Sequence, residues 1–121
     1  MNAAQDILYN VVYMTGLGEF EQVVLLAILR LDDRAYGVAI REEIRACTGR
    51  APTPGALYIT LDRMEEKGLV SSRLGDPTPQ RGGRAKRFFR VTRSGVAAVR
   101  RAHTAYRNLL QGLELLGGAN A

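Results

Sequence analysis

The sequence predicts a mainly α-helical fold with one small β-hairpin, arranged as a winged helix-turn-helix followed by a C-terminal dimerisation helix. Three observations predict it: a capped helix begins at Thr53, a hairpin rich in glycine and arginine follows, and a helix with a heptad seam begins near Ser94. We expect an N-terminal arm over residues 1–16, a winged domain over 17–93, and a dimerisation helix with its tail over 94–121.

Composition limits the class of protein. The chain has 121 residues, of which 46% are hydrophobic, so it is long enough for one folded domain and is not wholly disordered. Its single cysteine, Cys47, allows no intrachain disulfide. No apolar run has the length of a membrane span, and the N-terminus lacks the basic region of a signal peptide. We therefore expect a cytoplasmic protein that does not associate with membranes.

Three helices are expected before Thr53. Residues 3–14 have an amphipathic pattern in which Ile7 and Val11 would contact a partner subunit, although a frayed terminus would have the same sequence. Residues 19–31 are apolar on most sides, which predicts a central, largely buried helix. Residues 36–48 form the next helix, with Cys47 on its inner stripe as a small buried side chain.

The helix after Thr53 has clear boundary signals. The Thr53 side chain can cap the helix, Pro54 suits the first helical position, and Gly68 is a typical terminator. Its predicted inner face is Leu57, Thr60, Leu61 and Met64.

The opposite face of this helix is the candidate for contact with nucleic acid. It presents Gly55, Ile59, Asp62, Arg63 and Glu66, with Tyr58 on its flank. Ile59 points outward, either as a scattered surface hydrophobe or to contact a thymine methyl group in the major groove. Because Asp62 and Glu66 would repel phosphates, we expect only the N-terminal half of the helix to enter the groove.

The hairpin is the predicted wing. Residues 69–74 and 87–92 form its strands, with Phe89 and Val91 toward the core. Seven cations lie between positions 73 and 93, opposed only by Asp76: Arg73, Arg81, Arg84, Lys86, Arg87, Arg90 and Arg93. Residues 69–110 sum to +9, whereas residues 1–68 sum to −3. A basic face on a slightly acidic body predicts binding to the phosphates of double-stranded DNA, although such a charge run can also be a solvated face.

The last helix is expected to be capped by Ser94 and to run to about Leu116. Its a/d seam predicts a homodimer through Val96, Val99, His103, Tyr106, Leu110 and Leu113. His103, the only histidine, is either a packed imidazole or a protonation-sensitive group at the interface. Leu8, Val12, Leu26, Leu109 and Leu113 could line a cavity for a small hydrophobic effector between subunits, or could simply form the dimer core.

Catalytic chemistry is not expected. One histidine, one cysteine and no clustered carboxylates leave nothing for a catalytic triad or a metal centre, so we expect neither an enzyme nor a cofactor. The predicted DNA contacts are Thr53, Pro54, Gly55, Tyr58, Ile59, Arg63, Arg81, Arg84, Lys86, Arg87 and Arg90. The alternative function is a winged-helix module that binds another protein without binding DNA.

Four segments in order resemble the PadR-type transcriptional regulators. Residues 36–40 (YGVAI) are similar to the opening of their second helix, and 54–65 (PGALYITLDRME) to their recognition helix. Residues 68–70 (GLV) are similar to the entry to their wing, and 83–95 to their wing signature, with Phe88 and Phe89 in place of paired tyrosines. The resemblance covers about residues 17–110, and the single C-terminal helix is similar to the short subfamily. It implies a homodimeric repressor that binds an inverted-repeat operator and often releases DNA on sensing a small molecule.

Overall fold

The structure, a computed structural model, describes residues 16–76 and 85–114. These ranges form a mainly helical fold with one antiparallel hairpin, which confirms the predicted fold class. The elements are α2 (Glu19–Leu31), a 3-10 turn η1 (Asp32–Arg34), α3 (Gly37–Thr48), α4 (Pro54–Glu66), β1 (Val70–Leu74), β2 (Arg87–Val91) and α5 (Arg93–Leu110). The predicted arm with Ile7 and Val11, and the arginines Arg81 and Arg84, lie outside the described residues.

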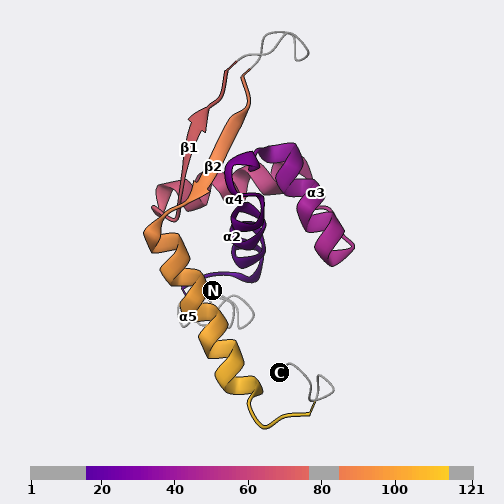
Figure 1. The fold of residues 1–121 in the computed structure, drawn as a ribbon, viewed down its shortest axis with the longest axis vertical. Helices are drawn as coiled ribbons and strands as arrows, with labels where there is room; N and C mark the ends of the chain where they lie inside the picture. Colours follow the sequence, from indigo (N-terminus) through magenta and orange to yellow (C-terminus); the bar gives the residue numbers. More distant parts are fainter. Residues whose placement is uncertain (1–15, 77–84, 115–121) are drawn as a thin grey trace, which may run out of the picture.

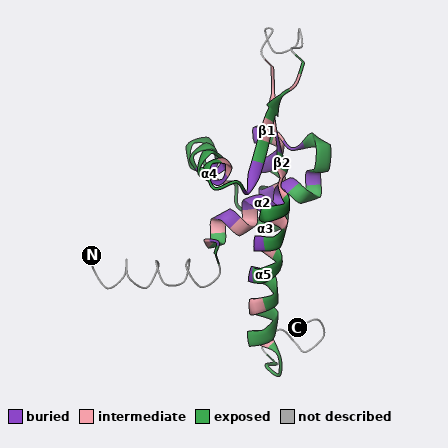
Figure 2. Cartoon of the chain, turned by 90° about the vertical axis from the view of Figure 1, so that its left-hand side faces the viewer, coloured by how far each residue is buried: buried purple, intermediate pink, exposed green. Residues whose placement is uncertain are grey.

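Helix α2 is the centre of the fold and has the predicted bounds. It contacts α3, α4, α5 and β2, and its buried apolar side chains are Val24, Leu25, Ala27, Ile28 and Leu31 (Figures 1 and 2). Leu26 and Leu29 are 48% and 43% exposed, so one side of this apolar helix is not covered by the described residues. The expectation that α2 is buried on most sides holds, with that one side as the exception.

A buried carboxylate ties the start of α2 to the end of α4. Glu21 accepts a hydrogen bond from the Gly18 backbone N–H at 3.0 Å, which helps to cap α2. Its other oxygen is paired with Lys67 Nζ at 2.9 Å. Because Glu21 is only 7% exposed, this pairing supplies the partners that a buried charge requires.

The last turns of α3 extend beyond the core, and this overturns the prediction for Cys47. Gly37, Ile40 and Ile44 are the buried residues of the helix, while every residue from position 45 to 50 is exposed. The thiol of Cys47 is therefore exposed and lies 3.5 Å from Glu43. Glu43 also accepts a hydrogen bond from Arg30 at 2.6 Å, and these two bonds lower the pKa of its carboxyl. The sequence spacing was compatible with burial, but the neighbouring elements do not reach this turn.

Strands β1 and β2 form the wing, which projects from one end of the molecule (Figure 1). Each strand is one residue shorter than predicted, and Val70 pairs with Val91. Phe89 is buried as expected, and its backbone N–H donates to the Ala35 carbonyl at 2.8 Å. Strand β2 is thus held by the short segment between η1 and α3 as well as by β1.

Helix α5 begins and ends earlier than predicted. Thr92, not Ser94, is the N-cap: its hydroxyl accepts from the Gly95 N–H at 3.1 Å and donates to the Gly68 carbonyl at 2.6 Å. The helix ends at Leu110 instead of near Leu116, which places Leu113 beyond it. Figure 1 shows α5 extending away from the wing.

Small residues attach α5 to the core. Gly95, Ala98 and Ala102 are its buried residues, whereas most of the helix beyond them is exposed (Figure 2). His103 is exposed in the single chain, so the expected packing of its imidazole would need a second chain.

No helix in the described ranges combines the length and the apolar character needed to cross a membrane.

Gly95 allows α5 to approach the wing. A Cβ at this position would overlap the Leu69 carbonyl oxygen and would lie 2.6 Å from Val91 Cγ1. Glycine to alanine in a helix normally stabilises, by roughly 0.5–1 kcal/mol. We predict that Gly95→Ala instead lowers the free energy of unfolding, by about 1–3 kcal/mol, as expected for overpacking against backbone.

Urea denaturation of Gly95→Ala beside Gly55→Ala would test this. Gly55 is also helical, but a Cβ there meets nothing within 4 Å. Gly55→Ala should therefore keep or raise stability. A Gly95→Ala protein as stable as the wild type would contradict the close packing of α5.

Candidate nucleic-acid interface

The start of α4 is built as predicted. The Thr53 hydroxyl accepts a hydrogen bond from the Ala56 N–H at 3.1 Å, and Pro54 occupies the first turn. The buried residues of the helix are Leu57, Thr60, Leu61 and Met64, which confirms the predicted inner face. On the opposite side Gly55 is exposed and Ile59 is 60% exposed. The N-terminal half of α4 therefore presents an open face to solvent.

The turn before α4 is fixed by side-chain contacts. Arg41 on α3 donates from Nε to the Pro52 carbonyl at 2.6 Å. The Tyr58 ring lies against the first turn of α3, where a Cβ at Gly37 would overlap its hydroxyl group. Tyr58 is nevertheless 41% exposed, so part of this residue is accessible to solvent. These contacts hold α3 and α4 in a defined helix-turn-helix geometry.

The inner face of the wing presents Arg87 to α4. Its guanidinium pairs with Asp62 at 3.1 Å and with Glu65, and its Nε donates to the Ser72 hydroxyl at 3.1 Å. Ser72 in turn donates to Glu65 at 2.7 Å. We expected Arg87 to neutralise phosphates, but in the structure two carboxylates of α4 already bind it.

The outer face of the wing bears an aromatic and cationic stack. By the strand register, Arg73 pairs with Phe88 and Ser71 with Arg90, so these four side chains share one face. The Arg73 guanidinium lies 5.0 Å from the Phe88 ring centre.

On its other side, Phe88 packs edge-on against Tyr36. The two ring centres are 5.7 Å apart, and the Lys86 amine lies 4.1 Å from the Tyr36 ring. Phenylalanine at position 88 thus has an apolar, cation-binding role that needs no phenolic hydroxyl.

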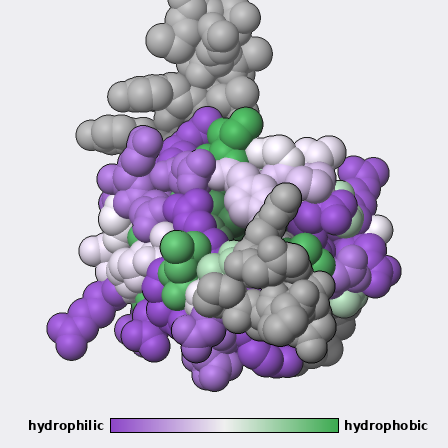
Figure 3. All heavy atoms as spheres, turned by 90° about the horizontal axis from the view of Figure 1, so that it is seen from above, coloured by the Kyte–Doolittle hydropathy of each residue, from purple (hydrophilic) through white to green (hydrophobic). Residues whose placement is uncertain are grey.

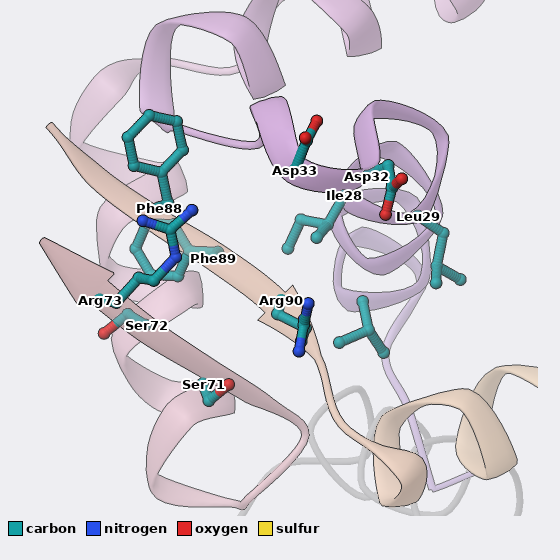
Figure 4. Close-up of a pocket in the computed structure, with 11 residues that line it drawn as sticks. Ile28, Leu29, Asp32, Asp33, Ser71, Ser72, Arg73, Phe88, Phe89 and Arg90 are labelled. Carbon is teal, nitrogen blue, oxygen red and sulfur yellow. The ribbon is translucent and has the colours of Figure 1, made fainter. Parts of the chain in front are cut away.

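A hollow of about 420 Å³ separates this outer face from the end of α2 and η1 (Figure 4). Figure 4 shows Arg73 across Phe88 on the wing, with Asp32 and Asp33 on the other side of the hollow. Neither Arg73 nor Arg90 forms an ion pair with a described residue. The outer face of the wing therefore offers two cations that remain available to an external anion.

Other charged groups agree with an interface for a polyanion. Arg63 is exposed on α4 and makes no ion pair within the described ranges. Seen from the wing end, the visible surface is mostly hydrophilic with small hydrophobic patches (Figure 3).

Among the residues that the structure describes, no group of three or more histidine, cysteine or acidic side chains could hold a metal ion.

Comparison with known proteins agrees with this geometry. Residues 25–101 match the model of the transcriptional regulator PadR-like family. The chain belongs to this family. It is 36% identical over 89 residues to the transcriptional regulator Rv3488 of Mycobacterium tuberculosis, a match that covers 72% of this chain and 75% of the relative.

Solved structures of PadR regulators have the same fold. A PadR family transcriptional regulator from Eggerthella lenta is 25% identical with a TM-score of 0.61, and the match covers 98% of both chains. A PadR family regulator from Clostridium difficile is 23% identical with a TM-score of 0.60, over 74% of this chain and 90% of the other. Membership of the family makes this chain a non-enzymatic transcriptional regulator with a winged-helix DNA-binding fold. The resemblance implied the regulator and its fold, and the residue inventory predicted that it is not an enzyme.

The structure brings most of the predicted contacts of this PadR-like regulator to two neighbouring elements. Pro54 to Ile59 and Arg63 lie on α4, with Thr53 as its N-cap, and Lys86, Arg87 and Arg90 lie on or beside β2. Arg73 was not among the predicted contacts, although it shares the outer face with Arg90. The period of two along β1 could have placed Arg73 there, because directly paired residues lie on the same face of a sheet.

Proposed function

We propose that this PadR-like regulator is a homodimeric repressor that binds an inverted-repeat operator through α4 and the wing. The observation that supports it most is an open α4 N-terminus beside a hairpin whose Arg73 and Arg90 form no ion pair with any residue that the structure describes. In a helix-turn-helix the N-terminal residues of the recognition helix contact base edges, and basic side chains beside it bind phosphates. Both requirements are met by elements in contact with each other.

Helix α4 would enter the major groove by its first two turns. In its first turn Pro54 has no N–H and the Ala56 N–H is bound by the Thr53 hydroxyl, so the Gly55 N–H would be the donor to a phosphate oxygen. The absence of a side chain at Gly55 allows close approach. Ile59 would contact a thymine methyl, Arg63 would lie toward the bases, and Tyr58 would contact the DNA backbone. The Asp62 carboxylate would repel DNA phosphates and so limits how far the second half of the helix can enter the groove.

The wing would bind the phosphates beside that groove. Arg73, Lys86 and Arg90 are the described cations that suit this role, while Arg81 and Arg84 remain expected contacts outside the described residues. Each neutralised phosphate releases counterions, so binding should weaken as salt increases.

An apolar side of the molecule supports the homodimer. Four large hydrophobic residues on or near α2 and α5 are exposed: Leu26 (48%), Tyr106 (58%), Leu109 (77%) and Leu113 (47%). A groove of about 470 Å³ between the helices is lined by Leu26, Val99, His103, Tyr106 and Leu110, with Gln22 and Arg107. Five predicted seam residues of α5 (Val96, Val99, His103, Tyr106 and Leu110) thus remain at least partly exposed in one chain.

A second subunit would cover this groove and would place two copies of α4 about 34–36 Å apart, one turn of B-DNA. A small hydrophobic effector that entered the same groove could alter this spacing and release the operator. The groove would thus serve both as the dimer interface and as the binding site of the effector.

The first prediction concerns the wing. Arg90→Gln should weaken binding to all duplexes and reduce the slope of log K against log salt by about 1, because one phosphate contact is lost. Fluorescence anisotropy at several salt concentrations measures both quantities. Arg100→Gln removes the same charge from the exposed surface of α5 and should leave the slope unchanged. Equal slopes for wild type and Arg90→Gln would remove the wing from the interface.

The second prediction concerns base recognition. Ile59→Ala should change the base preferred at one or two positions, by about 1–3 kcal/mol each, because the contact with a thymine methyl is lost. Binding-site selection followed by sequencing measures this preference. Val38→Ala truncates another exposed aliphatic, on α3, and should leave the selected motif unchanged. An absence of any DNA binding by the wild type at moderate salt would instead favour a protein-binding module.

The third prediction concerns self-association. Tyr106→Glu places a charge on the proposed seam and should shift the protein from dimer to monomer, because an unpaired charge is costly to bury. Sedimentation velocity measures the two species. Asn108→Glu adds the same charge to the same helix but away from the seam, and should leave the dimer intact. If Tyr106→Glu remains dimeric, the interface lies elsewhere.

A further inference from the structure

We propose that Arg87 is a positioning residue that holds the wing on the recognition helix, and that it does not bind DNA phosphate. This inference rests on the proposed function, because it explains how two DNA-contacting elements keep one relative orientation. It assigns Arg87 a role different from that of Arg73 and Arg90, although all three belong to the same basic hairpin.

The hydrogen bonds of Arg87 are the first argument. All three guanidinium nitrogens have partners: Nη1 donates to Asp62, Nη2 to Glu65 and Nε to the Ser72 hydroxyl. The guanidinium also lies 4.8 Å from the centre of the Phe89 ring. The planar fork of arginine suits such simultaneous contacts, whereas an exposed phosphate ligand would be free of them.

The direction of the side chain is the second argument. Arg87 pairs with Leu74, and its side chain shares the wing face of Ser72 and Phe89, toward α4. Arg73 and Arg90 lie on the opposite face and have no carboxylate partner among the described residues. Among its described arginines, the hairpin thus has one, Arg87, that is bound by carboxylates of the protein and two, Arg73 and Arg90, that are available to DNA.

Local charge is the third argument. Arg87 provides one positive charge beside the two negative charges of Asp62 and Glu65, so the group remains net negative. A phosphate that approached this group would meet two carboxylates already bound to the arginine, and repulsion would oppose it. Arg87 instead reduces the repulsion that Asp62 would exert on DNA near α4.

The location of these contacts explains their effect. Phe89 anchors the base of β2 in the core, and Arg87 lies two residues nearer the tip of the wing. Phe89 thus attaches the wing to the core, while Arg87, together with Ser72, attaches it to the carboxylates of α4. Because α4 and the wing must meet the same duplex, their fixed orientation removes an ordering cost from binding.

Substitution by lysine tests the proposal at constant charge. Lysine binds phosphate well but cannot reproduce the arginine fork. We expect Arg87→Lys to weaken binding to the duplex selected by the wild-type protein by about tenfold, the loss typical of broken hydrogen bonds to charged groups. The slope of log K against log salt for this variant should equal that of the wild type. The matched change on the outer face, Arg90→Lys, should remain within about threefold of wild-type affinity, because a lysine there still binds phosphate.

Arg87→Gln gives a second readout. If Arg87 positions the wing, this variant should bind more weakly with an unchanged salt slope, unlike Arg90→Gln. Wild-type affinity in Arg87→Lys, or a slope reduced by about 1 in Arg87→Gln, would overturn the proposal and make Arg87 a phosphate ligand. All assays should be run at a temperature where circular dichroism shows each variant to be folded. A wild-type protein that binds no duplex would instead overturn the proposed function, and this inference with it.

Discussion

The position of strand β2 is the constraint on which the rest of this structure depends. Its centre is fixed by the buried Phe89 side chain and by the hydrogen bond from the Phe89 N–H to the Ala35 carbonyl. Because Ala35 lies between η1 and α3, the wing is joined directly to the start of the helix-turn-helix. A wing held only by its own hairpin would be marginal, since an isolated two-stranded ribbon has little stability in water.

Contacts on both faces of the hairpin then define its orientation. On one face Arg87 reaches the carboxylates of α4, and on the other Phe88 packs between Tyr36 and Arg73. The same strand continues through Thr92 into α5, whose first turn is held by the Gly68 carbonyl. The wing, the recognition helix and the last helix thus meet at one junction, so a disturbance there would affect all three.

Local chemistry explains which features could be predicted from the sequence. The cap at Thr53 and the inner face of α4 depend on residues that follow one another at intervals of no more than four positions, and both were predicted correctly. The sequence near Ser94 did not identify Thr92 as the cap of α5, because Thr92 also donates a hydrogen bond to the carbonyl of Gly68, 24 residues away. Cys47 was misplaced because helical periodicity defines a face of α3 but not how far the core extends along it.

The candidate site likewise combines features that nearby residues determine with features that only the fold determines. Sequence alone indicated which hairpin was basic, but could not show which of its arginines the protein itself neutralises. The partners of Arg87 lie 22 and 25 residues earlier in the chain, so only the fold brings them together. Its neighbour Arg90 has the same side chain and a different environment, and that difference comes from the alternation of the strand.

The exposed Cys47 has a practical consequence. It is the only thiol in the chain and lies in the exposed last turn of α3. A nitroxide or a fluorophore can therefore be attached at one defined position without altering the native sequence. In an assembly of two chains, the pair of labels would give a spectroscopic ruler for the separation of the two helix-turn-helix units.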